Sequence, residues 1–281
     1  MASRRSSKRY VRRKSTGRKK RSYVRSTRKR TYRRKTMTKK SILNTTSKKK
    51  RDTMLPWTNM TPSSQSGSST YTTSPAVITG GVSLAPMFIW CATARDLTPN
   101  SGPAAPGYIA TRTSTSCYMR GLSEKIEIQI SDGLPWQWRR ICFTAKGFVD
   151  ELTVTGSFSV HNETSNGMQR TINQPTGINR TYIERYLFKG EVNVDWNDQM
   201  IAPVDRTRVT VMYDKTITIA AGNDSGSIRK YARYHPMNKT LVYDDDEKGD
   251  TEDSGYYSVG SKAGMGDYFV VDIFRPSSGG R

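Results

Sequence analysis

The residues of this chain with the clearest chemical potential are the lysines and arginines of its first 51 positions. This segment holds 24 lysines and arginines and no aspartate or glutamate, while the whole chain of 281 residues has 46 basic and 24 acidic residues. Residues 52–281 therefore have 46 − 24 = 22 basic and 24 acidic side chains, a net charge of −2. Uncompensated cations at this density bind polyanions and release their counterions. The chemistry predicted for the segment is the binding of nucleic-acid phosphates.

The basic residues form short clusters, with Tyr10, Tyr23 and Tyr32 among them. Any base can stack on an aromatic ring, so this mixture favours single-stranded nucleic acid without sequence preference. Basic clusters are also typical of nuclear import signals, and the two roles are compatible. The predicted import residues are Arg18, Lys19, Lys20, Arg21, Arg28, Lys29 and Arg30. The predicted nucleic-acid contacts are Arg4, Arg5, Arg9, Arg12, Arg13, Arg18, Lys19, Lys20, Arg21, Arg28, Lys29, Arg30, Arg33, Arg34, Lys35, Lys48, Lys49, Lys50 and Arg51.

Residues 1–51 are predicted to be a disordered arm. Apolar residues are sparse before position 41 and follow no helical or strand period, so nothing offsets a chain entropy of about 1–2 kcal/mol per residue. A mitochondrial transit peptide or a membrane-surface anchor would need an apolar face, which this segment lacks. The sequence contains no run of 18 apolar residues and no secretory signal, so no membrane partner is expected.

The rest of the chain reads as a linker followed by strands. Residues 52–75 are predicted to be an extended Ser/Thr-rich linker, and residues 76–281 are long enough for one all-β domain. Apolar and polar residues alternate in this part, as Ile126, Ile128 and Ile130 show in EKIEIQIS. Runs rich in β-branched and aromatic residues indicate about eight strands, at 85–92, 124–131, 139–146, 152–160, 184–196, 208–213, 216–220 and 267–274.

The predicted fold is a single jelly-roll β-sandwich of about eight antiparallel strands. Turns with Gly beside Asn or Asp separate the strands at 131–136, 162–167 and 220–226. The connections are long and irregular, which favours a double-sheet sandwich over an up-and-down barrel. No long helical pattern is present, although residues 226–234 could form a helical turn or two.

No motif in the sequence supports catalysis. Two histidines, His161 and His235, leave little room for acid–base chemistry or a metal site, and a surface position is expected for His161. The chain has no G-x-x-x-x-G-K-[ST] loop and no G-x-S-x-G elbow. Cys91, Cys117 and Cys142 are expected to be reduced, small apolar residues in strands. We therefore expect no enzyme activity, no cofactor and no metal ion.

Two other segments allow alternative interpretations. The acidic run DDDEKGDTED at 244–253 could hold a cation, but a solvated loop or a contact with a neighbouring subunit is favoured. RKYARYH at 229–235 repeats the basic and aromatic pattern of the arm. That segment could contact nucleic acid or pack against another subunit.

Four blocks resemble a known family. SILNTTSKKKRDTMLPWTN (41–59), TGGVSLAPMFIWCATARDL (79–97), SEKIEIQISDGLPWQWRRICFTAKG (123–147) and GDYFVVDIFRP (266–276) are similar to capsid proteins of genomoviruses, small circular single-stranded DNA viruses. The resemblance implies an icosahedral shell of sixty copies, a circular single-stranded DNA cargo and assembly after nuclear import. It also implies a separate replication enzyme, so it transfers no catalytic residues.

The hypothesis is a viral capsid protein that self-assembles into a small icosahedral shell and packages circular single-stranded DNA. Its partners would be the DNA genome, further copies of itself and host nuclear import receptors, and it would occur in the virion and the host cell nucleus. Sixty arms with 24 charges each give 60 × 24 = 1440 charges, enough to balance on the order of 1–2 thousand nucleotides. The alternative is a cellular nucleic-acid-binding protein, ribosomal or chromatin-like, but such proteins usually carry a basic face on the fold as well.

Overall fold

The structure, a computed structural model, describes residues 36–81, 85–98, 105, 107–152, 158–222 and 224–277. The chain divides into two units, Met1–Lys48 and Lys49–Arg281. Most of the predicted arm, residues 1–35, lies outside the described residues. The boundary falls three residues before the predicted end of the arm, because residues 49–51 belong to the second unit.

The described part of the first unit contains a short helix, α1 (Lys39–Thr46). Thr38 caps its N-terminus by accepting a hydrogen bond from the Ser41 amide on its Oγ1, at 3.2 Å. None of its residues is buried. The prediction of disorder is therefore wrong for these eight residues, where the N-cap satisfies an amide that the helix leaves unpaired.

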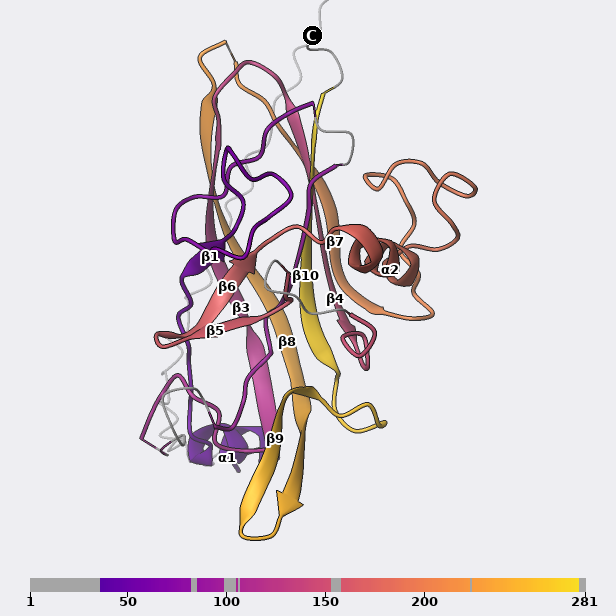
Figure 1. The fold of residues 1–281 in the computed structure, drawn as a ribbon. Helices are drawn as coiled ribbons and strands as arrows, with labels where there is room; N and C mark the ends of the chain where they lie inside the picture. The colour runs from indigo at the N-terminus through magenta and orange to yellow at the C-terminus, as the bar shows by residue number, and fades with distance from the viewer. Residues whose placement is uncertain are drawn as a thin grey trace, which may run out of the picture. The chain divides into compact units, whose positions relative to one another are not determined.

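The second unit contains a four-stranded antiparallel sheet with the order β2-β10-β4-β7 (Figure 1). Its strands are β2 (Met87–Cys91), β10 (Asp267–Pro276), β4 (Trp136–Ala145) and β7 (Thr210–Ile219). All five residues of β2 and the first seven of β10 are buried. Strands covered on both faces have continuous apolar runs, which explains the dense patterns of MFIWC and YFVVDIF.

A second antiparallel sheet has the order β3-β8-β9, formed by β3 (Ser116–Ile130), β8 (Ser227–Lys248) and β9 (Thr251–Ser258). It packs on one face of the four-stranded sheet. Met237 of β8 and Leu122 of β3 contact a cluster formed by Trp90, Cys142, Tyr268 and Val270. The fold is therefore an all-β, sandwich-like arrangement of antiparallel sheets, which confirms the predicted class. Figure 1 shows β8 running along β3 and continuing into the hairpin with β9.

The other face of the four-stranded sheet is covered by α2 (Gly177–Leu187) and the segment that follows it (Figure 1). Ile183 and Leu187 pack with Phe143 and Phe269 in the largest apolar cluster. The strand predicted at 184–196 is wrong, because α2 continues to Leu187 and turns follow. The buried face of α2 combines Ile183 and Leu187 with the polar Asn179, Arg180 and Glu184, so it lacks the continuous apolar stripe that would have indicated a helix.

Residues 52–75 are not a free linker. Within them β1 (Pro56–Thr58) pairs in parallel with β6 (Gly167–Ile172), which also pairs with β5 (Asn162–Thr164). Asn59 and Met60 have no exposed surface. The predicted linker is therefore partly built into the second unit, and its Ser/Thr-rich composition did not indicate the pairing with a strand more than 100 residues away.

Most other predicted strands are confirmed. Those at 85–92, 124–131, 139–146 and 267–274 correspond to β2, β3, β4 and β10, and the two at 208–220 form the single strand β7. Most of the run at 152–160 lies outside the described residues. Residues 227–234 belong to β8, so the helical turn suggested for 226–234 is wrong.

The acidic run at 244–253 forms the hairpin of β8 and β9 rather than a loop. One of its carboxylates is not solvated. The Asp245 side chain is 1% exposed and forms an ion pair with Arg112, which is 2% exposed. The guanidinium of Arg112 also lies 4.0 Å from the centre of the Tyr243 ring.

Candidate nucleic-acid interface

The structure describes only four of the predicted nucleic-acid contacts. The fifteen from Arg4 to Lys35 lie outside the described residues, and so do all seven predicted import residues. Lys48 is the last residue of the first unit, and Lys49, Lys50 and Arg51 are the first of the second. The candidate interface is taken from the basic residues of the second unit, Lys49, Lys50 and Arg51.

Two hydrogen bonds hold residues 50 and 51 against a neighbouring segment. The Arg51 amide donates to the Ile109 carbonyl at 3.1 Å, and Lys50 Nζ donates to the Thr111 carbonyl at 2.7 Å. Residues 49–51 and 107–111 together are called the arm root below. These bonds set where the chain leaves the fold, and they lie just before the start of β3.

The electrostatics of β3 place Lys50 in the same area. Burial raises the pKa of the Cys117 thiol, and the charges of Arg112 and Lys50 oppose that shift. A lysine can act on Cys117 in this way only from nearby. The cationic end of the arm therefore lies beside the first residues of β3.

The arm root also exposes apolar and aromatic surface. Tyr108 is 60% exposed and Ile109 is 64% exposed. Tyr108 directly precedes Ile109, whose carbonyl accepts the hydrogen bond from the Arg51 amide. This arrangement suits a base that stacks while lysine and arginine contact its phosphates. Tyr108 could not be predicted from the sequence, because its neighbours in SGPAAPGY are uncharged.

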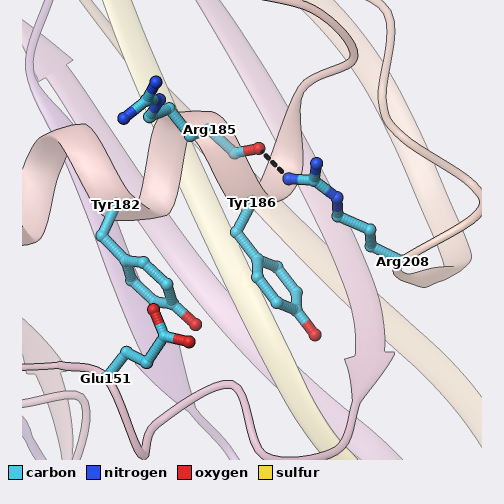
Figure 2. A pocket seen from close by; sticks show the side chains of 5 residues that line it. All are labelled: Glu151, Tyr182, Arg185, Tyr186 and Arg208. Carbon is cyan, nitrogen blue, oxygen red and sulfur yellow. Dashed lines mark hydrogen bonds between the residues drawn. The ribbon is translucent and has the colours of Figure 1, made fainter.

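A second feature is a pocket beside α2, lined by Glu151, Tyr182, Arg185, Tyr186 and Arg208 (Figure 2). The two tyrosine rings lie side by side below the helix, with Glu151 next to Tyr182. Arg208 Nη1 donates to the Arg185 carbonyl at 2.5 Å. Burial raises the pKa of Tyr182 to about 12 and also raises that of Tyr186. These hydroxyls stay protonated at neutral pH, so neither tyrosine supplies a nucleophile to the pocket.

Among the described residues, Cys142 of β4 and His235 of β8 are in contact between the two large sheets. Cys142 Sγ is 3.9 Å from His235 Nδ1 and 4.0 Å from Nε2. Burial raises the pKa of the Cys142 thiol to about 12 and lowers the pKa of His235. A nucleophilic cysteine needs a stabilised thiolate and access to substrate. This pair has neither and serves as part of the core.

The sequence suggested a surface position for His161. In the structure this residue is half-buried, so that expectation is wrong. Its Nδ1 is 2.5 Å from the Tyr257 hydroxyl, and its ring stacks on Tyr256 with 4.4 Å between centres. Burial lowers the pKa of His161 to about 4, whereas an unfolded histidine titrates near about 6.5. Between these two pKa values the unfolded chain binds a proton at His161 that the folded chain does not bind. The free energy of unfolding therefore decreases as the pH falls from about 6.5 towards about 4.

A His161→Phe variant keeps an aromatic ring against Tyr256 but cannot titrate. We expect its Tm to fall less than that of the wild type between pH 7 and pH 5. Buried Asp267, whose pKa is raised to about 6, has the opposite dependence but is common to both proteins. Thermal unfolding followed by circular dichroism at both pH values measures the difference. Equal falls in Tm would show that His161 does not titrate differently in the two states.

No group of three or more His, Cys, Asp or Glu side chains that could hold a metal ion occurs among the described residues. No helix in the same part of the chain is long and apolar enough to cross a membrane. In comparisons with known proteins, no protein-family model and no curated sequence matches the chain.

Proposed function

We propose that this protein is a viral capsid protein that assembles into a small icosahedral shell and packages circular single-stranded DNA. The observation that carries the proposal is the division of charge. The first 51 residues hold 24 basic and no acidic residues, while residues 52–281 have a net charge of 22 − 24 = −2. In such a protein the near-neutral β-sandwich can form the protein shell, while the separate polycationic arm binds a polyanion inside it.

The strand order supports a jelly-roll assignment. Leaving out β1 and the β5–β6 hairpin, the first strand, β2, pairs with the last, β10, and the next strand, β3, pairs with β8. In a Greek key, a later strand returns by a long connection to lie beside the first strand of the unit. A jelly roll contains two such units. Folds of this kind present loops and edges that can meet neighbouring copies around symmetry axes.

The arm root supports the proposed role of the arm. Lys50 and Arg51 are tied to residues 109 and 111 by hydrogen bonds, so every copy would release its basic segment at the same point of the fold. Sixty copies in a closed shell would concentrate these segments in one compartment. Binding without sequence readout is what the packaging of a whole genome requires.

The arm would also direct the protein to the host cell nucleus before assembly. The clusters at 18–21 and 28–30 are the residues assigned to import receptors. A fluorescent reporter fused to residues 1–35 should accumulate in nuclei, and alanine at these seven positions should return it to the cytoplasm. An unchanged nuclear signal in the substituted fusion would remove these clusters from the import role.

Electron microscopy distinguishes the capsid from the cellular alternative. The full chain is purified at high salt, dialysed to physiological salt with circular single-stranded DNA and imaged by negative staining. Closed particles of uniform diameter are the expected result. Irregular complexes that dissolve as salt is raised would instead indicate a ribosomal or chromatin-like binding protein.

A further inference from the structure

The sheet of β3 and β8 has an outward face that contains part of RKYARYH (229–235), the segment for which the sequence allowed either nucleic acid or another subunit as the partner. Side chains alternate along both strands, so that Leu122 and His235 turn towards the core while Ser123 and Tyr234 are exposed. Three large apolar or aromatic side chains on this face are more than half exposed: Tyr118 at 54%, Ile228 at 62% and Tyr234 at 59%. The outer sheet face is defined here by Tyr118, Arg120, Lys125, Ile228, Lys230 and Tyr234.

Tyr234 lies across β3, over Gly121. A Cβ atom at position 121 would lie 2.8 Å from the Tyr234 hydroxyl oxygen and 2.9 Å from its Cζ. The same hydroxyl donates to the Arg120 carbonyl at 3.2 Å. Gly121 has φ +157° and follows a register shift at Met119/Gly121. The missing side chain makes room for the ring, which packs on the backbone and leaves its other side to solvent.

Cations lie on both sides of this ring. Arg120 belongs to the strand segment that the hydroxyl contacts, and its Nη1 donates to Asn238 Oδ1 at 3.2 Å. Lys125 pairs with Ala232, two residues from Tyr234 on the same face, a diagonal separation of about 7–8 Å between backbones. Farther along, Lys230 forms an exposed ion pair with Glu127 at 3.2 Å. With Glu127 included, this face has a net charge of 3 − 1 = +2, on a part of the chain that is slightly negative overall.

We propose that the outer sheet face is a second binding site for single-stranded DNA, at which a base stacks on Tyr234 while Arg120 and Lys125 contact the flanking phosphates. The proposal rests on the proposed function for the identity of the polymer. An exposed aromatic ring between cations is the usual platform for single strands. The buried centres of protein–protein interfaces are depleted in lysine, so Lys125 and Lys230 argue against a second copy of the chain as the occupant.

Photo-crosslinking tests this site in the full chain. The protein is bound to single-stranded DNA that contains 5-iododeoxyuridine, irradiated and digested with trypsin and nuclease, and nucleotide adducts are located by mass spectrometry. We expect adducts on the peptide 234–239 in addition to those on the arm. The peptides with Tyr182 and Tyr186 are the internal control, because α2 covers the opposite face of the four-stranded sheet, and they should remain unmodified.

Substitutions separate the ring from the fold. Tyr234→Phe keeps a ring over Gly121 and should retain the adduct. Tyr234→Leu should abolish it, and Arg120→Gln with Lys125→Gln should lower its yield several-fold, with arm adducts unchanged in both variants. Circular dichroism confirms that each variant is folded.

Each other outcome is decisive. Adducts confined to the arm would overturn the sheet site while leaving the proposed function in place. No adduct anywhere, with all DNA open to nuclease, would overturn both. Variants that reduce the yield of closed particles but keep the adduct on 234–239 at its wild-type level would make the face a subunit contact and overturn the assignment of Tyr234 as the stacking platform.

Discussion

A chain that begins at residue 49 should fold like the full protein and bind single-stranded DNA orders of magnitude more weakly. No described residue of 36–48 is buried, and the three apolar clusters contain no residue before Met54. The truncation therefore removes nothing that these clusters need. It does remove 24 − 3 = 21 basic residues. At about 0.7 per phosphate contact, the slope of log K against log salt should become shallower by up to about 15.

Fluorescence anisotropy over a series of salt concentrations measures both the affinity and the slope. A chain that begins at residue 36 keeps six basic residues of the arm, namely Lys39, Lys40 and those at 48–51, and should give a result between the two. The matched control is a full chain in which the order of residues 1–35 is scrambled. Binding without sequence readout predicts that this control binds like the wild type. Equal affinity and slope for the chain that begins at 49 would contradict the role of the arm.

Replacing Asp272 with Asn should destabilise the fold more than any surface substitution. Its carboxylate accepts hydrogen bonds from Arg140 Nε at 2.7 Å, Arg170 Nη2 at 2.9 Å and Trp138 Nε1 at 2.7 Å. Glu124 accepts from the same two arginines. The exposed fractions of these four charged side chains lie between 3% and 15%. This cluster links β10, β4, β6 and β3, so it joins the two large sheets to the small one.

Removal of the carboxylate leaves the buried guanidinium of Arg140 and the half-buried guanidinium of Arg170 with one partner carboxylate. Breaking a buried ion pair in this way costs about 3–5 kcal/mol, and denaturant unfolding should show a loss of that size. Asp253→Asn is the matched control, because Asp253 pairs with Lys248 while both are more than 70% exposed, and its unfolding midpoint should not change. An unchanged midpoint for Asp272→Asn would show that the cluster does not hold the sheets together.

The protonation state of Asp272 gives the same argument a pH dependence. Burial alone would raise its pKa, but Arg140, Arg170 and Trp138 outweigh burial and hold the pKa below its usual range. The ionised Asp272 carboxylate therefore makes its full contribution to the free energy of unfolding above the pKa of an unfolded aspartate, about 3.9. This contribution is lost as the pH falls through the lower pKa of the folded state. The difference between wild type and Asp272→Asn should shrink in strong acid.

The sequence predicted secondary structure best in strands whose buried residues alternate with exposed ones or form a continuous apolar run. Ile126 and Ile128 on β3 and the dense run of β10 predicted their strands correctly. The helix α2 was missed because polar residues such as Arg180 and Glu184 occupy its buried face and satisfy each other there. The pairing of β1 with β6 and the burial of Asp245 against Arg112 depend on partners more than 100 residues away. No local pattern encodes such contacts.

The candidate sites divide in the same way. The charge of the arm is a property of composition and needs no structure to be seen. The arm root depends on the backbone hydrogen bond between Arg51 and Ile109, two residues that are far apart in the sequence. The stacking platform needs a glycine on one strand beneath a tyrosine on the next. RKYARYH is compatible with both DNA and protein partners, and the position of Tyr234 over Gly121 is a contact that the sequence does not reveal.

The most direct test of the account is the amount of DNA held per chain in purified particles. Full-length protein is assembled with circular single-stranded DNA and treated with nuclease, and particles are separated by density before phosphate and protein are measured. If 24 arm charges per chain neutralise the cargo, protected DNA should amount to roughly 20–30 phosphates per chain. Particles that lack protected DNA, or complexes in which nuclease degrades all of it, would contradict the claim that the arm is a packaging device.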